Sequence, residues 1–438
     1  MHAQPGFEAN IMRALNRTYC NISRLMLIGI LLFGGASEAA PTPDYAQLYA
    51  AHDFFALRLA LASEAHPRSD QAQFYTAAVM TAFNRPAAAD KIIDKRLRRP
   101  IDANLRLELL EMRMQNARRL SDDAGALKVA QALISSYEHK GEANKLMELR
   151  NTAKLLGVLS TIPQQRVIRR GASHIALLHD DNGNYCIPFN IGTQSPCYIL
   201  DTGANHSTLI RSEAKRLNLK VLPAGIELGT GTDAKLPADV AVAPLLKIGN
   251  LEYRNADFLV VPDAAFTLKN FQIRGILGYE IFSGMGAVTA RQGHMIDVPA
   301  TVPDSDVDNI AFDGRDLLTK IKVNGHALLC RIDTGADHTV FYKSYYDRYK
   351  SEVEKTGALQ ITKMAGGGGI RTFKGYILPR LDLELAGHTI TLQRVTVFTE
   401  PVIPQDYLMC NLGLDALKGF KSYTINLHSM ALTVDGAH

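Results

Sequence analysis

The chain has 438 residues, which is long enough for two or three domains. Its apolar fraction of 47% and charged fraction of 21% are ordinary for a globular protein. The net charge of +4 is small for this length and the basic residues are scattered, so no nucleic-acid partner is expected.

The first forty residues have the pattern of a secretory signal. Three arginines (Arg13, Arg17, Arg24) precede an apolar run over Leu25–Phe33, and a stretch rich in small residues follows over Gly34–Ala40. The run is too short to cross a bilayer, which takes roughly 20 apolar residues. We therefore expect a signal peptide over residues 1–39 and an exported protein, periplasmic or secreted, without a stable membrane span. An uncleaved anchor or a buried helix is the alternative.

Removal of this segment would also remove Cys20 and leave four cysteines. An even number in an exported chain permits disulfides, and four cysteines allow three connectivities, among which the sequence does not choose. Buried free thiols are an equally simple alternative. The four are Cys186, Cys197, Cys330 and Cys410.

Residues 44–162 are predicted to form a helical domain. Apolar residues recur every three or four positions, as at Leu105, Leu109 and Met112. Helices of this length, separated by short breaks, predict stacked helical hairpins, either a tetratricopeptide-like array or a plain bundle. Such arrays present surfaces for peptides or partners. A protein partner on this domain is therefore a reasonable expectation.

The residue pattern changes after Pro163, where runs of β-branched and aromatic residues separated by glycines predict strands. From about residue 170 to the end, the chain is predicted to be mainly β. The predicted strands are Tyr185–Ile191, Cys197–Leu200, Phe258–Val261, Leu317–Val323, Leu328–Ile332 and Thr391–Phe398.

This β region contains the same plan twice. Asp-Thr-Gly-Ala occurs at residues 201–204 and again at 333–336, each time after a strand, a glycine turn and a second strand. Each copy continues to a glycine-rich turn and closes on a Leu-Gly pair, Leu277-Gly278 and Leu412-Gly413. The interval from Asp to this glycine is 77 residues in the first copy (278 − 201) and 80 in the second (413 − 333). Near-equal intervals indicate an internal repeat.

The two motifs resemble those of the aspartic peptidases. The alanine after each Asp-Thr-Gly is similar to the retropepsin-like branch, whereas two motifs in one chain resemble the pepsin-like enzymes. The resemblance covers the β region and implies a mainly β bilobal fold with a pseudo-two-fold axis. The lobes would span residues 170–300 and 308–438, preceded by the all-α domain. Asn411 departs from the pattern, because the family usually has an apolar residue there.

Peptide hydrolysis by water needs a base that takes a proton and an acid that supplies one. Two adjacent carboxylates can do both, because like charges about 3 Å apart cannot both ionise and the pair shares one proton. Asp201 and Asp333 are therefore the expected catalytic residues of an aspartic endopeptidase, with base and acid left unassigned. The competing hypothesis is a catalytically inert exported peptide-binding or scaffold protein. The retention of both aspartates favours the enzyme.

The resemblance also implies supporting roles for neighbouring residues. Thr202 and Thr334 would lock the two loops together, and Gly203 and Gly335 suit a turn where a side chain would block the other lobe. The glycine-rich stretches resemble the tips of flap hairpins that close over substrate. The residues expected to contact substrate are Ala204, Asn205, Ala336, Asp337, Gly229, Gly231, Gly367 and Gly368.

No metal or cofactor is expected from the motifs. The sequence has no paired Cys-x-x-Cys and no helical histidine pair of a zinc site. Gly366–Gly369 lacks the following Lys-Ser/Thr of a phosphate-binding loop. His206 and His338, which follow the two motifs, are interpreted as surface or loop residues, with a pH-sensitive role as the alternative.

Overall fold

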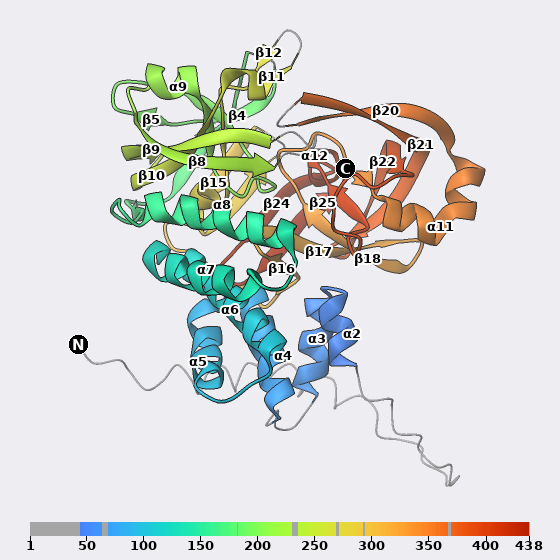
Figure 1. Ribbon diagram of the computed structural model, residues 1–438. Helices are drawn as coiled ribbons and strands as arrows, with labels where there is room; N and C mark the ends of the chain where they lie inside the picture. The colour runs from blue at the N-terminus through green and yellow to red at the C-terminus, as the bar shows by residue number, and fades with distance from the viewer. Residues whose placement is uncertain are drawn as a thin grey trace, which may run out of the picture. The chain divides into compact units, whose positions relative to one another are not determined.

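The computed structural model describes residues 44–63, 69–181, 183–229, 235–268, 271–291, 294–366 and 369–437. The expected signal peptide, residues 1–39, lies outside them. From Asp44 onward the chain forms a single unit. It is helical first and rich in strands from Arg166, as the colours of Figure 1 show.

Seven helices precede the first strand among the described residues. Aspartate or serine side chains at residues 44, 53, 69, 102 and 122 accept hydrogen bonds from the N–H groups of the first turns, which explains where these helices begin. Successive helices pack on one another, as expected of helical hairpins. The helices are α2 (Tyr45–Ala50), α3 (Phe54–Ala62), α4 (Asp70–Ala82), α5 (Pro86–Leu97), α6 (Ala103–Arg119), α7 (Asp123–Tyr137) and α8 (Ala143–Leu159).

These helices share their hydrophobic core with the strands. Buried residues of α3 to α6, such as Leu57 and Leu109, belong to the same cluster as the buried residues of the sheets. Leu155 and Leu159 of α8 pack in a second cluster with Ile210 and other residues of the β region. Within the part of the chain that the structure describes, two smaller clusters lie entirely within α6, α7 and α8. The helical segment is therefore packed as part of one structure with the strands.

The first large sheet follows the order β3-β4-β6-β13-β7-β10-β9-β5, with β1 on β10 and β8 on β9. The hairpin of β8 and β9 ends at the first glycine-rich stretch, where Gly229 pairs with Lys235. The strands are β1 (Arg166–Arg169), β3 (Leu178–His179), β4 (Tyr185–Pro188), β5 (Asn190–Ile191), β6 (Cys197–Leu200), β7 (Thr208–Ile210), β8 (Lys220–Gly229), β9 (Lys235–Ile248), β10 (Leu251–Val261) and β13 (Gly275–Leu277).

The second large sheet follows the order β16-β17-β18-β23-β19-β22-β21-β20. Its β20–β21 hairpin ends at the second glycine-rich stretch, where Gly366 pairs with Gly369. The strands are β16 (Ile310–Asp313), β17 (Asp316–Val323), β18 (His326–Ile332), β19 (Val340–Phe341), β20 (Ala358–Gly366), β21 (Gly369–Leu385), β22 (His388–Phe398) and β23 (Cys410–Leu412).

The two large sheets use the same central pairing. In the first, β6 runs parallel to β13, β13 antiparallel to β7, and β7 parallel to β10. In the second, β18 runs parallel to β23, β23 antiparallel to β19, and β19 parallel to β22. Each Asp-Thr-Gly loop therefore leaves a strand that is hydrogen-bonded to the strand carrying the later Leu-Gly pair.

A five-stranded sheet joins the two halves of the β region, because β14 of the first half pairs antiparallel with β24 of the second. A two-stranded hairpin, four α-helices and a 3-10 helix over Asp263–Phe266 complete the β region described. These elements are β2 (Ser173–Ala176), β14 (Ala287–Arg291), β15 (Met295–Val298), β24 (Phe420–Asn426), β25 (Ala431–Ala437), β11 (Thr267–Leu268), β12 (Phe271–Gln272), α9 (Arg211–Arg216), α10 (Tyr279–Met285), α11 (Lys343–Thr356) and α12 (Leu414–Leu417).

Five of the six predicted strands lie within single observed strands, and the first, Tyr185–Ile191, is divided by Phe189 into β4 and β5. The four cysteines that follow Cys20 form two disulfides, Cys186–Cys197 and Cys330–Cys410, so the free-thiol alternative is wrong. Among the described residues, no helix combines the length and apolar character that a bilayer crossing requires.

Candidate active site

The two aspartates occupy equivalent places at the ends of β6 and β18. The N–H of Asp201 donates to the carbonyl of Leu277 at 2.9 Å, and the N–H of Asp333 donates to the carbonyl of Leu412 at 3.0 Å. Each Leu-Gly pair thus fixes the first residue of the Asp-Thr-Gly loop in its own half. This is why the motif and the later Leu-Gly pair recur together in the sequence.

Two threonine hydroxyls cross-link the loops. The N–H of Thr202 donates to Oγ1 of Thr334 at 3.0 Å, and that hydroxyl donates to the carbonyl of Leu200 at 2.7 Å. In the reverse direction, the N–H of Thr334 donates to Oγ1 of Thr202 at 3.1 Å, and that hydroxyl donates to the carbonyl of Ile332 at 3.0 Å. Both threonines are buried. The two loops are therefore held together by four crossed hydrogen bonds.

The glycines of the motifs allow this close approach. A Cβ on Gly203 would lie 2.7 Å from Cγ of Asp333, and a Cβ on Gly335 would lie closer still to Cγ of Asp201. Real Cβ atoms do not approach other atoms so closely, so neither position accepts a side chain while the carboxyls face each other. Each glycine N–H also donates to Oδ1 of the aspartate in its own loop, at 2.8 Å and 3.0 Å.

Proximity and burial perturb the pair. Burial, the neighbouring charge of Asp333 and the hydrogen bond with its side chain raise the pKa of Asp201 to about 7. A carboxyl with this pKa retains its proton in weakly acidic solution, and a second carboxyl faces it across the two loops. The arrangement can therefore supply both an acid and a base at one point.

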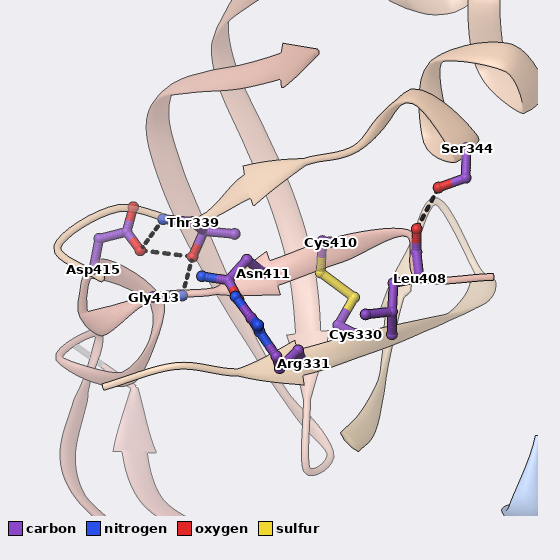
Figure 2. The surroundings of a disulfide bond; sticks show 9 residues. All are labelled: Cys330, Arg331, Thr339, Ser344, Leu408, Cys410, Asn411, Gly413 and Asp415. Carbon is purple, nitrogen blue, oxygen red and sulfur yellow. Dashed lines mark hydrogen bonds between the residues drawn. A yellow bond between two sulfur atoms is a disulfide. The ribbon is translucent and has the colours of Figure 1, made fainter. Parts of the chain in front are cut away.

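Two further hydrogen bonds in each half hold the residue that follows the loop, Ser207 or Thr339. Gly278 N–H donates to Oγ of Ser207 at 3.0 Å, and the N–H of Ser207 donates to Oε2 of Glu280 at 3.1 Å. In the other half, Gly413 N–H donates to Oγ1 of Thr339 at 3.0 Å, and the N–H of Thr339 donates to Oδ1 of Asp415 at 2.8 Å (Figure 2). The acid two residues after each Leu-Gly pair thus has a structural role in both halves.

The surroundings of the two aspartates differ at one paired position. Behind Asp333, Arg331 of β18 lies opposite Asn411 of β23, whereas the equivalent residues behind Asp201 are Ile199 and Ile276. Nδ2 of Asn411 lies 2.8 Å from Oδ2 of Asp333, and a guanidinium nitrogen of Arg331 lies 3.3 Å from the same oxygen. The sequence indicated this difference only through Asn411, which departs from the family pattern. It gave no reason to expect Arg331 beside Asp333.

His206 belongs to a buried polar network beside the first loop. A guanidinium nitrogen of Arg118, at the end of α6, lies 2.9 Å from Nε2 of His206, and Nδ1 of His206 lies 2.9 Å from Oε1 of Glu280. Arginine can only donate, so Nε2 accepts and the proton sits on Nδ1. Burial lowers the pKa of His206 to about 4, which is consistent with a neutral ring. Interpretation of His206 as a surface residue is therefore wrong, whereas a loop hydrogen-bonding role fits.

Arg315 completes this network by donating to the carbonyl of Asn205 at 2.6 Å and to Oε1 of Glu280. His206, Asp257 and Glu280 place possible ligand atoms within 4.8 Å of one another. The guanidinium groups of Arg118 and Arg315 already contact His206 and Glu280, so two of these three residues are engaged by cationic side chains.

The remaining predicted residues fall into three groups. Ala204 and Ala336 lie in the loops, where their carbonyls accept from the N–H groups of Tyr279 and Leu414, while Asn205 and Asp337 are exposed. Gly229 is the last residue of β8. The predicted flap residues Gly231, Gly367 and Gly368 lie outside the described residues. The His338 side chain is 84% exposed and has Asp415 nearby, whereas the His206 side chain is 14% exposed.

Comparison with known proteins addresses the first half of this arrangement. Residues 187–281 match the family model of aspartyl proteases. The matched segment contains the loop of Asp201 and the first Leu-Gly pair, which supports an aspartyl protease family for this region. No curated protein matches the chain.

Proposed function

We propose that the protein is an aspartic endopeptidase in which Asp201 and Asp333 together activate water for peptide hydrolysis. The observation that carries this proposal is the crossed pair of Asp-Thr-Gly loops. Four hydrogen bonds from Thr202 and Thr334 hold the loops together, and each glycine leaves room for the opposing carboxyl. The match to aspartyl proteases supports the same activity.

The reaction follows from one proton shared by two carboxyls. The ionised carboxyl takes a proton from a water held between the pair, and the water oxygen bonds to the carbonyl carbon. The protonated carboxyl gives its proton to the carbonyl oxygen, so that a gem-diol forms. The first carboxyl then passes its proton to the leaving nitrogen as the C–N bond breaks, and a diol hydroxyl returns a proton to the second. The pair ends as it began.

The wider proposal is a single-chain, bilobal enzyme that combines retropepsin-like and pepsin-like features. The equivalent pairing of the two large sheets supports a pseudo-two-fold relation between residues 170–300 and 308–438. Export is part of the proposal, and the two disulfides support it because such bonds persist in oxidising compartments. The hairpins β8–β9 and β20–β21 are proposed as flaps, and the helical region as a place for a protein partner.

A peptide library tests the activity and defines the substrate preference. The protein from Ala40 to His438 should cleave internal peptide bonds. A transition-state mimic with a hydroxyl in place of the scissile carbonyl should block that cleavage. Binding of peptides without any cleavage between pH 3 and pH 8 would instead favour the inert peptide-binding alternative.

A further inference from the structure

The orientation of the Asn411 amide is fixed by its neighbour. Nε of Arg331 donates to Oδ1 of Asn411 at 2.8 Å. A guanidinium has donors only, so the amide oxygen must face Arg331 and the amide nitrogen must face Asp333. Figure 2 shows the two side chains adjacent on β18 and β23. Oδ2 of Asp333 therefore receives a donor from Asn411 at 2.8 Å and has a guanidinium nitrogen of Arg331 at 3.3 Å.

We propose that Arg331 and Asn411 make the two carboxyls unequal, holding Asp333 as the carboxylate and leaving the shared proton on Asp201. Hydrogen bonds and positive charge directed at a carboxyl favour its ionised form. The backbone contributions are matched, because Gly203 and Gly335 each donate to Oδ1 of their own aspartate. The difference between the two sites therefore comes from the two side chains.

The equivalent positions behind Asp201 cannot supply these donors. Ile199 and Ile276 pair across β6 and β13 in the same register as Arg331 and Asn411 across β18 and β23. Their side chains have no polar atoms. The raised pKa of Asp201, which burial and the charge of Asp333 cause, agrees with a proton on this residue.

Other ionisable groups face Arg331 and must be separated from this effect. Asp316 of β17 lies 3.9 Å from the guanidinium, and burial raises its pKa. Tyr342 lies near the same guanidinium, and burial raises its pKa to about 12, so it is neutral over the range in which the pair titrates. A change at Asn411 leaves the contact of Arg331 with Asp316 in place, and is therefore the cleaner perturbation.

The inference assigns the two roles that the proposed hydrolysis leaves open, and in this respect it rests on that function. Asp333 would take the proton from water and later give it to the leaving nitrogen. Asp201 would give its proton to the carbonyl oxygen and recover one from the gem-diol. Arg331 and Asn411 would act through Asp333 as positioning residues.

The pH profile of kcat/KM tests the assignment with the variant Asn411→Leu, which matches the shape of asparagine without its donor. In the proposed assignment the basic limb reports loss of the proton from Asp201, and Asp333 is a carboxylate before and after that step. Loss of the Asn411 donor should therefore leave the basic limb in place. It should move the acidic limb, where Asp333 takes up a proton, to a pH about one unit higher. Arg331→Lys, which keeps the charge but not the bond to Asn411, should shift the acidic limb in the same direction. Ile276→Leu, at the mirrored position, should shift neither limb.

A shift of the basic limb alone in Asn411→Leu would place the proton on Asp333 and overturn the proposal. Titration of carboxyl carbons by NMR in the ligand-free protein separates this inference from the proposed function. With signals assigned through Asp201→Asn and Asp333→Asn, Asp333 should ionise first and Asn411→Leu should raise its titration midpoint. Ionisation of Asp201 first would refute the inference. If the predicted titration occurred in a protein that cleaves no peptide, the inference would stand and the proposed function would fail.

Discussion

The crossed threonine hydroxyls are expected to carry both stability and activity. Thr334→Val keeps the shape of the side chain but removes the acceptor of the Thr202 N–H and the donor to the Leu200 carbonyl. Each buried polar group that loses its partner costs about 1–3 kcal/mol, so the loss of two partners should lower the free energy of unfolding by roughly 2–6 kcal/mol. Thr202→Val breaks the two reciprocal bonds and should cost a similar amount.

Urea unfolding followed by far-ultraviolet circular dichroism measures this cost, since the chain has no tryptophan to report by fluorescence. Thr319→Val is the matched control. Thr319 is equally buried, but its hydroxyl makes one hydrogen bond, to the carbonyl of Asn309 at 3.0 Å, away from the two loops. It should lose roughly half as much stability and keep its kcat. The loop variants should lose at least about tenfold in kcat, because misplaced carboxyls no longer act together.

The double variant sharpens the test. The two hydroxyls bond to backbone groups and not to each other, but both hold one interface. The two costs should therefore not add, and the second substitution should cost less than the first because the first has already loosened the interface. If both loop variants matched Thr319→Val in stability and kept wild-type kcat, the crossed bonds would not be what holds the carboxyls in place.

Three further predictions concern stability. The pKa of Asp201 is raised from 3.8 to about 7, so between these pH values the folded state binds more protons than the unfolded state. The free energy of unfolding should therefore fall as the pH rises through this range, by at most about 4 kcal/mol. Asp201→Asn should flatten this pH dependence of the urea midpoint, and parallel curves for variant and wild type would contradict the reasoning. The Cys330–Cys410 disulfide closes a loop of 80 residues and Cys186–Cys197 a loop of 11. Replacing the first pair by alanine should lower the free energy of unfolding by about 4.5 kcal/mol, and replacing the second by about 3 kcal/mol. The reverse order would refute the loop-entropy reasoning. Removal of residues 44–162 should expose the shared core and abolish cooperative unfolding, and a stably folded remainder would show that the helical segment is separable.

Local patterns predicted much of the secondary structure. The three-to-four-residue spacing of apolar side chains found the helical segment, and the β-branched runs found strands such as β6, whose bounds Cys197–Leu200 match the prediction. The internal repeat also predicted that two loops would be equivalent. These features depend on residues near one another in the chain, so a single sequence shows them.

Long-range choices could not be predicted in this way. One example is the disulfide Cys330–Cys410, which has no counterpart in the first half. The residues equivalent to these cysteines are Tyr198 and Gly275, and the ring of Tyr198 lies where a Cβ on Gly275 would be. The same place between paired strands is thus filled by a disulfide in the second half and by an aromatic ring in the first. The shared core of helices and strands depends likewise on contacts between segments that no local pattern records.

The polar surroundings of the site were the least predictable part. Arg331 looks like an ordinary strand residue, and its effect depends on Asn411, 80 residues later, and on the register of β18 with β23. His206 looks like a loop histidine until Arg118 of the helical segment is placed beside it. A charged side chain acquires such a role only from the groups that burial brings to it.

The most direct test of the central claim is the turnover of Asp201→Asn and Asp333→Asn on one peptide substrate. An amide can neither accept the proton of water nor share one with the opposite carboxyl, so kcat should fall at least about 10³-fold in each variant while the fold is retained. Asp304→Asn, at a side chain that is 95% exposed, is the control and should keep wild-type kcat. Near-normal turnover by either loop variant would show that hydrolysis does not depend on this pair of aspartates.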